Sequence, residues 1–331
     1  MKPQVTLKKL ADMLNLSIST VSRSLTNHPD IAEETRTKVK ELANLLEYEP
    51  NTHAINLRTR DSKEFGIIIP AISNYFYNSF ISSLEEEARR FGYSLVILQS
   101  GEDPAIEQEN LKKCKQNRVA GVFVSITNKT TDIDNFLKLT EQQTPVIFFD
   151  KVPAFEACNK VCVADASAAT MAAERIILKK KKHVLAIFGN KEMSITKRRR
   201  VAFEAAFLNY PTKTKLSVKY ANNTEEALKL VLKNVNGEAK PDAIFCMSDE
   251  ILVGVMKAIQ MMKLRLPDDI GVITISDGFF PQLYYPEISY VETSGYKLGK
   301  LAFTRMLACL AGSYFVQELT VDSILVDGGS L

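Results

Sequence analysis

Residues 16–29 read LSISTVSRSLTNHP, and small hydroxyl side chains crowd a stretch whose apolar spacing is that of a helix. A solvated helix would more often carry Glu and Lys, because Ser and Thr lower helix propensity. Small hydroxyls let a helix approach the major groove of DNA and can bond phosphates or base edges, while Arg23 can bind guanine through two hydrogen bonds. The stretch therefore favours a DNA-recognition helix over its alternative, a serine-rich solvated helix.

Polar and aromatic side chains also follow several apolar runs further along the chain. In open α/β folds, ligands bind outside the carboxyl ends of the strands, so these residues are candidates for an effector cleft. Asp150 and Asp277 could instead cap helices or turns, and Phe76 and Tyr77 could belong to the core. By position, the candidates are Asn74, Phe76, Tyr77, Ser125, Asp150, Ser248, Asp249 and Asp277.

Three short helices are predicted to carry the first group of residues. Thr6 is a good N-cap, and apolar residues at helical spacing follow it. Asn15 tolerates the left-handed conformation that a tight turn needs, and Ser17 can cap a second helix. A third helix is predicted from Glu33 to about residue 47, before Pro50 breaks the pattern. Together these helices predict a compact helix-turn-helix unit.

Short apolar runs alternate with helical stretches from residue 65 onward. The runs lie at 65–70, 93–98, 119–126, 145–150, 184–188, 216–220, 242–247 and 270–275, and the first helical stretches lie around 78–91, 105–117 and 132–141. This alternation is typical of βαβ units with a parallel sheet. Because the rhythm restarts near residue 184, two α/β lobes are predicted, with a ligand between them.

Composition and termini argue against several other classes of protein. The formal net charge of +3 is too small to indicate nucleic-acid binding by composition alone. No apolar run has the length of a membrane span and the N-terminus lacks a secretion signal, so no membrane partner and a cytoplasmic location are expected. The 5 cysteines are scattered and are expected to be reduced. No metal and no cofactor are expected.

An enzyme or a free-standing solute-binding protein accounts for the pattern less well than a regulator. The chain contains no GxGxxG, no GxxxxGKS/T and no GxSxG motif, and two of its 3 histidines, His28 and His53, precede the α/β region. Catalysis is therefore not expected. A solute-binding protein would explain the two lobes but not residues 1–60, and it would need an export signal.

Residues 6–59, TLKKLADMLNLSISTVSRSLTNHPDIAEETRTKVKELANLLEYEPNTHAINLRT, resemble the DNA-binding headpiece of the lactose-repressor and galactose-repressor family of bacterial regulators. The resemblance continues through almost all of the chain. It implies a headpiece in residues 1–50, a hinge helix and linker in residues 51–62, and a two-lobed periplasmic-binding-protein-like domain in residues 63–331 for effector binding and dimerisation. The chain is expected to cross between the lobes near residues 161, 292 and 321.

The resemblance also implies the residues that contact DNA. In that family the hinge helix pairs with that of its dimer mate and wedges a leucine between base steps in the minor groove. Leu57 stands at this position, with interdomain packing as its alternative role. The implied DNA contacts are Thr6, Ser17, Ile18, Ser19, Thr20, Ser22, Arg23, Asn27, Asn51, Ala54 and Leu57.

The stretch MSITKRRRVAF matches the family's effector motif Ser-x-x-x-x-Arg-x-x-Gly-Phe, with Ala202 in place of Gly. The family's arginine and aspartate that match Arg199 and Asp277 grip the effector, which suits a polyhydroxylated ligand because a fork of donors faces an acceptor carboxylate. Ser248 and Thr293 replace a common Asn and Gln, which leaves the ligand open. The implied effector contacts are Asn74, Phe76, Tyr77, Ser125, Asp150, Ser194, Arg199, Ser248, Asp277 and Thr293.

The resemblance implies a ligand-responsive transcriptional regulator, most often a repressor. It would bind a pseudo-palindromic DNA operator as a homodimer and respond to a sugar-like small molecule. The alternatives are a ligand-sensing protein without operator-specific repression and a regulator that responds to a non-sugar metabolite. Leu14 and Asn15 stand where the family usually has Ala-Gly, and Ala32 replaces a common Ser cap, so lower local stability of the headpiece is expected.

Overall fold

The computed structural model describes residues 5–49, 62–210, 213–235, 240–313 and 315–331. The chain divides into two compact units, Met1–Ser62 and Lys63–Leu331. Positions Asn51, Ala54 and Leu57, which were predicted to contact DNA, lie outside the described residues.

The first unit contains helices α1 (Leu7–Leu14), α2 (Ile18–Leu25) and α3 (Glu33–Leu45). The predicted caps are confirmed: Thr6 and Ser17 accept hydrogen bonds from the N–H groups of Lys9 and Thr20, and Asn15 is left-handed with φ 57°. Ala32 precedes α3 and makes no side-chain cap bond. Apolar residues from all three helices form one small core, namely Leu10, Ala11, Val21, Val39 and Ala43. A three-helix core therefore holds α2 in place.

The second unit begins with a sheet in the order β11-β5-β4-β3-β1-β2, which we call lobe 1. All pairings within this sheet are parallel. The strands are β1 (Glu64–Ile69), β2 (Ser94–Gln99), β3 (Gly121–Val124), β4 (Val146–Phe149), β5 (Asn159–Val163) and β11 (Glu318–Val321), and the helices are α5 (Tyr75–Arg90), α6 (Pro104–Gln116), α7 (Asp134–Glu141) and α12 (Gly295–Leu310). Successive residues of β4 face opposite sides of the sheet. Phe149 packs with Phe80 of α5 on one side, and Phe148 packs with Phe136 of α7 on the other.

The other sheet has the order β12-β10-β9-β8-β6-β7, and we call it lobe 2. Its strands are β6 (His183–Phe188), β7 (Lys215–Tyr220), β8 (Ala243–Cys246), β9 (Gly271–Ser276), β10 (Ser289–Glu292) and β12 (Ile324–Val326), and its helices are α8 (Asp165–Leu178), α9 (Ser194–Asn209), α10 (Thr224–Val235) and α11 (Asp249–Met261), with a short 3-10 turn at Pro281–Leu283. Only the edge strand β12 pairs antiparallel within the described sheet. One large apolar core occupies this lobe.

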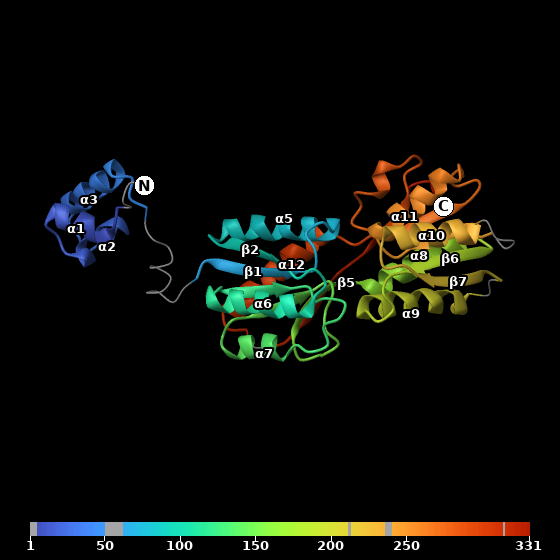
Figure 1. The fold of residues 1–331 in the computed structure, drawn as a ribbon, viewed down its shortest axis with the longest axis horizontal. Coiled ribbons are helices and arrows are strands. Elements are labelled where there is room, and N and C mark those ends of the chain that lie inside the picture. The colour runs from blue at the N-terminus through green and yellow to red at the C-terminus, as the bar shows by residue number, and fades with distance from the viewer. Residues whose placement is uncertain (1–4, 50–61, 211–212, 236–239, 314) are drawn as a thin grey trace. The chain divides into compact units, whose positions relative to one another are not determined.

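Figure 1 shows the two lobes joined by crossing segments. The chain leaves lobe 1 after β5, leaves lobe 2 between β10 and α12, and leaves lobe 1 again after β11. Each predicted apolar run forms a strand, with ends that differ by up to two residues. Residues just beyond these strands therefore gather where one lobe meets the other.

Candidate DNA-binding surface and effector site

The outer surface of α2 presents the hydroxyl-rich stretch to solvent. Ser17, Ile18 and Ser19 are exposed at its N-terminal end, while Val21 is fully buried beneath them. The Ser17 hydroxyl lies 2.7 Å from that of Ser19 and 2.8 Å from that of Thr20. A recognition helix contacts bases from this end, so the geometry is compatible with the predicted surface.

The remaining described DNA candidates surround this surface. Arg23 is exposed and makes no salt bridge with any residue that the structure describes. Thr6 and Asn27 are exposed as well, and Asn27 has φ 57°. Ser22 is partly buried. An exposed guanidinium without a protein partner can reach a base or a phosphate.

On the lobe 1 side, three predicted effector residues touch one another. The Tyr77 hydroxyl donates to Asp150 Oδ2 at 3.0 Å and lies 2.9 Å from the Ser125 hydroxyl. The Tyr77 ring is also part of the lobe 1 core, so the core role that the sequence left open holds for the ring. Burial raises the pKa of Asp150, and the charges of Lys151 and Arg199 partly offset this effect. The influence of Arg199 indicates that the two lobes approach each other here.

On the lobe 2 side, Arg199 is 5% exposed and forms a buried ion pair with Asp165. Its Nε and Nη2 atoms both lie 2.8 Å from Asp165 Oδ1, and its Nη1 donates to the carbonyl of Met247 at 2.8 Å. Sequence reasoning missed Asp165, which opens α8 directly after the first crossing. The sequence around Asp165 shows only an acidic residue at the start of a helix. Acidic residues are common there because they interact favourably with the helix dipole, so this position does not stand out.

Asp249 opens α11, and the charge of Arg199 influences it. Its Oδ2 accepts the N–H of Asp277 at 3.4 Å, whereas its Oδ1 is buried without a partner among the described residues. Burial raises the pKa of Asp249 to about 6, and hydrogen bonds from Ser276 and Asp277 counteract part of this rise. We call Tyr77, Ser125, Asp150, Asp165, Arg199 and Asp249 the interlobe cluster.

The cost of burying Asp249 predicts a pH-dependent loss of stability. The pKa of Asp249 is raised from 3.8 to about 6, so the folded state holds this proton more tightly than the unfolded chain. Ionising it therefore lowers the free energy of unfolding as the pH rises from about 4 to about 6, by up to about 3 kcal/mol. Asp249→Asn should lack this loss. Denaturant unfolding of both proteins across this range measures the difference, and parallel curves would contradict the assignment.

Other predicted effector residues have structural contacts instead. Asn74 caps α5 by accepting the N–H of Phe76 at 3.0 Å, and Phe76 packs against the lobe 1 core. Thr293 is buried, and its N–H donates to the carbonyl of Ser276 at 2.8 Å. Ser248 is the N-cap residue of α11 but forms no side-chain cap bond. None of these contacts tests effector binding, so these positions stay predictions.

Ser194 and Asp277 connect the two lobes. The Ser194 hydroxyl donates to the carbonyl of Val152, and Asp277 Oδ1 accepts the N–H of Gly295 at 2.7 Å at the start of α12. Asp277 also lines a hollow formed with Tyr75, Asn78, Ser79, Ser82 and Tyr296 of lobe 1. Asp277 therefore has a capping role, as the sequence alternative allowed, and its contact with an effector stays a prediction.

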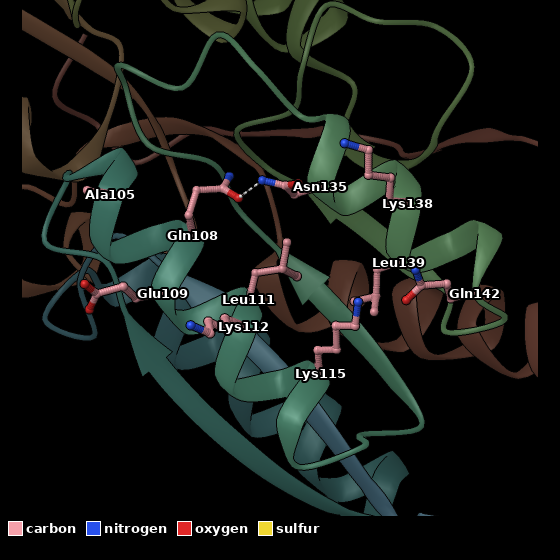
Figure 2. A pocket seen from close by; sticks show the side chains of 10 residues that line it. All are labelled: Ala105, Gln108, Glu109, Leu111, Lys112, Lys115, Asn135, Lys138, Leu139 and Gln142. Atoms are coloured by element: carbon pink, nitrogen blue, oxygen red, sulfur yellow. Dashed lines mark hydrogen bonds between the residues drawn. The ribbon is translucent and has the colours of Figure 1, made fainter.

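Figure 2 shows a separate groove on the outer surface of lobe 1, between α6 and α7. Lys112, Lys115 and Lys138 lie along it, and Gln108 is hydrogen-bonded to Asn135 across it at 3.0 Å. No predicted effector residue lines this groove. Within the described part of the chain, no cluster of His, Cys, Asp and Glu is suited to a metal ion. No described helix combines the length and apolarity of a membrane span.

Comparison with known proteins matches both units of the chain. Residues 6–51 match bacterial regulatory proteins of the lacI family, and residues 62–312 match the periplasmic binding proteins and sugar binding domain of the LacI family. The chain is 28% identical to the probable HTH-type transcriptional repressor ExuR of Bacillus subtilis, over 93% of this chain and 92% of that protein. It is 29% identical to the sucrose operon repressor of Streptococcus mutans, over 86% of this chain and 87% of that protein.

The fold is similar to that of the Lac repressor dimer bound to operator and the anti-inducer ONPF, with a TM-score of 0.88 at 18% identity over 99% of each chain. A helix-turn-helix unit followed by two lobes of the periplasmic-binding-protein type defines a ligand-responsive transcriptional regulator. The chain belongs to the LacI family of bacterial regulatory proteins. It is therefore a DNA-binding regulator rather than an enzyme.

Proposed function

We propose that the chain is a cytoplasmic repressor that binds a pseudo-palindromic operator as a homodimer and is controlled by a sugar or sugar derivative at the interlobe cluster. One observation carries this proposal. The same chain has exposed hydroxyl side chains on α2 and buried polar residues at the interlobe cluster. The names of relatives support it, since ExuR and the sucrose operon protein are described as repressors.

An exposed apolar surface supports the proposed homodimer. Phe279, Leu283 and Tyr285 of lobe 2 are all exposed, and Phe279 stacks on Tyr75 of lobe 1 with ring centroids 4.3 Å apart. Clustered exposed aromatic side chains are typical of protein interfaces. In the dimer, residues 63–331 would bind effector and partner, residues 1–50 would bind operator, and residues 51–62 would connect them. Effector binding would change how the lobes meet and whether the two hinge segments can enter DNA together.

Selection of DNA from a random pool tests the proposed function. The full-length protein is mixed with random-sequence duplexes, and the retained DNA is sequenced. We expect an enriched inverted repeat whose half-sites are spaced by whole helical turns, because each headpiece reads one half-site. Retention without an enriched sequence, in a protein that still binds a small molecule, would instead support the alternative of a ligand sensor without an operator.

The proposed minor-groove wedge gives a prediction for Leu57. Leu57→Ala should weaken operator binding on the order of tenfold and reduce the DNA bend, because an alanine is too small to unstack a base step. Fluorescence anisotropy and a bend-sensitive gel assay measure the two effects. Leu45→Ala is the matched control, since Leu45 is an exposed leucine at the end of α3. An unchanged bend in Leu57→Ala would show that Leu57 does not insert between base steps.

A further inference from the structure

Carboxylates outnumber cations around the interlobe cluster. Asp150, Asp165 and Asp249 all act electrostatically with Arg199, and Glu102 and Glu250 act with Lys151. Two more cations influence carboxylates here, but each already pairs with a different glutamate. Arg198 lies 3.2 Å from Glu318, and Lys297 lies 2.8 Å from Glu292. The carboxylates that interact with Arg199 and Lys151 therefore outnumber these two cations, which disfavours an anion between the lobes.

The two central cations are also already occupied. All three nitrogen atoms of the Arg199 guanidinium contact Asp165 or the Met247 carbonyl, each at 2.8 Å. Lys151 Nζ lies 2.6 Å from Glu102 Oε1. An anionic ligand could bind either cation only by displacing a carboxylate. Displacement would leave that carboxylate buried or half-buried without its counter-charge, which is costly.

Two buried oxygen atoms without a partner lie on α9 and α11: a carboxylate oxygen, which needs a hydrogen-bond donor, and a hydroxyl, which can accept or donate. Asp249 Oδ1 and Thr196 Oγ1 are buried without a partner among the described residues, and Thr196 is 1% exposed. The Thr196 hydroxyl lies beside Gly189 and Met247, at the carboxyl ends of β6 and β8. Buried polar atoms normally have a hydrogen-bond partner, so this pair indicates where ligand hydroxyl or ammonium groups would bind.

We infer that the effector of this protein carries hydroxyl or ammonium donors and no anionic group, so that neutral sugars and amino sugars bind and sugar acids and sugar phosphates do not. The inference rests on the proposed function, because it assumes that the interlobe cluster binds the effector. A carboxylate or phosphate at this place would be repelled by the surrounding carboxylates. We expect an acid to bind at least about a hundredfold more weakly than its neutral parent, since like charges in contact are strongly unfavourable.

Matched sugar trios test the inference with the full-length protein. Within a trio the parent sugar is constant and each derivative differs from it at one substituent. The trios are glucose, glucosamine and glucuronate, and galactose, galactosamine and galacturonate. The 6-phosphate of each parent sugar is tested as a further anion. Melting temperature and calorimetric affinity are measured for every compound. We expect at least one neutral or amino compound to raise the melting temperature by mass action while its acid and phosphate leave it unchanged.

An anion could also bind outside the interlobe cluster, in the lysine-lined groove of Figure 2. The double variant Lys112→Gln/Lys115→Gln therefore accompanies the wild type and should keep its binding of neutral and amino sugars. Asp249→Asn should weaken an amino sugar at least about tenfold more than the neutral parent, because only the amino sugar loses an ion pair with the carboxylate.

Each outcome separates the inference from the proposed function. An acid or phosphate that stabilises the wild type and the groove variant equally would overturn the inference and leave a sugar-type effector in place. Stabilisation by an anion that vanishes in the groove variant would place it in the groove and support the inference. Failure of every compound would count against the sugar-controlled function itself, and the inference would be rejected with it.

Discussion

Replacing Arg199 with leucine is expected to lower the free energy of unfolding by about 3–5 kcal/mol, because it leaves a buried carboxylate without its counter-charge. Asp165 is 5% exposed and receives both Nε and Nη2 of Arg199. The variant also frees the carbonyl of Met247, which accepts from Nη1. Denaturant unfolding of the full-length protein at neutral pH measures the change.

Two further variants separate this pair from general effects of losing an arginine. Arg198→Leu removes a neighbouring arginine whose pair with Glu318 is well exposed, so a change of at most about 1 kcal/mol is expected. The double variant Arg199→Leu/Asp165→Leu removes both buried charges and should recover most of the stability. Equal losses in Arg198→Leu and Arg199→Leu would show that the buried pair has no special role.

Arg23→Ala is expected to have the largest effect on operator recognition. Each bidentate arginine–guanine contact contributes about 1–3 kcal/mol of discrimination, and a dimer would lose two of them. Affinity for the selected operator should therefore fall by a factor on the order of 30 or more, and the preference at one position of each half-site should relax. Affinity for random duplexes should change much less.

Anisotropy titrations with selected and random duplexes measure both effects. Lys38→Ala is the control within the headpiece, because Lys38 is exposed on α3 and pairs with Glu34 at 2.6 Å. This variant should leave sequence preference unchanged. If Arg23→Ala weakened selected and random duplexes equally, Arg23 would be a phosphate contact and would read no base.

Local signals allowed the headpiece to be predicted from the sequence. The two cap side chains at Thr6 and Ser17, and the left-handed Asn15, all act on residues within five positions of themselves. Strands β1–β4 and β6–β9 were predicted for a similar reason, since most of them contain a run of apolar residues. Both features depend on residues that are close together in the sequence, so they can be recognised from the sequence alone.

Four short strands, β5, β10, β11 and β12, were not predicted from the sequence as strands. Two of these pairings join distant parts of the chain: β11 pairs with β5, so that Glu318 lies opposite Lys160, and β12 pairs with β10. The runs NKVCV, SYVE and ELTV mix polar with apolar residues, and β12 has only 3 residues, so none of the four shows a clear apolar run in the sequence. Only the resemblance to a family gave an expectation that the chain crosses between lobes nearby.

The candidate site was partly predicted for the same reason. Tyr77, Ser125, Asp150 and Arg199 were named from strand ends and a motif, and the structure brings them to one region. The Asp165–Arg199 pair joins residues that are 34 positions apart, and the bond from Gly295 to Asp277 joins residues 18 apart. No local pattern encodes such pairs, because tertiary packing creates them. The Asp165–Arg199 pair lies within lobe 2, whereas the bond from Gly295 to Asp277 joins the two lobes.

Titrations of DNA and effector in both orders measure whether this one chain couples an operator surface to an interlobe ligand site. Operator affinity is measured with and without saturating effector, and effector affinity is measured with and without saturating operator. We expect both affinities to change by the same factor, between about 5-fold and 150-fold, because the coupling free energy is shared. A factor near one in both titrations would show that effector binding does not control DNA binding.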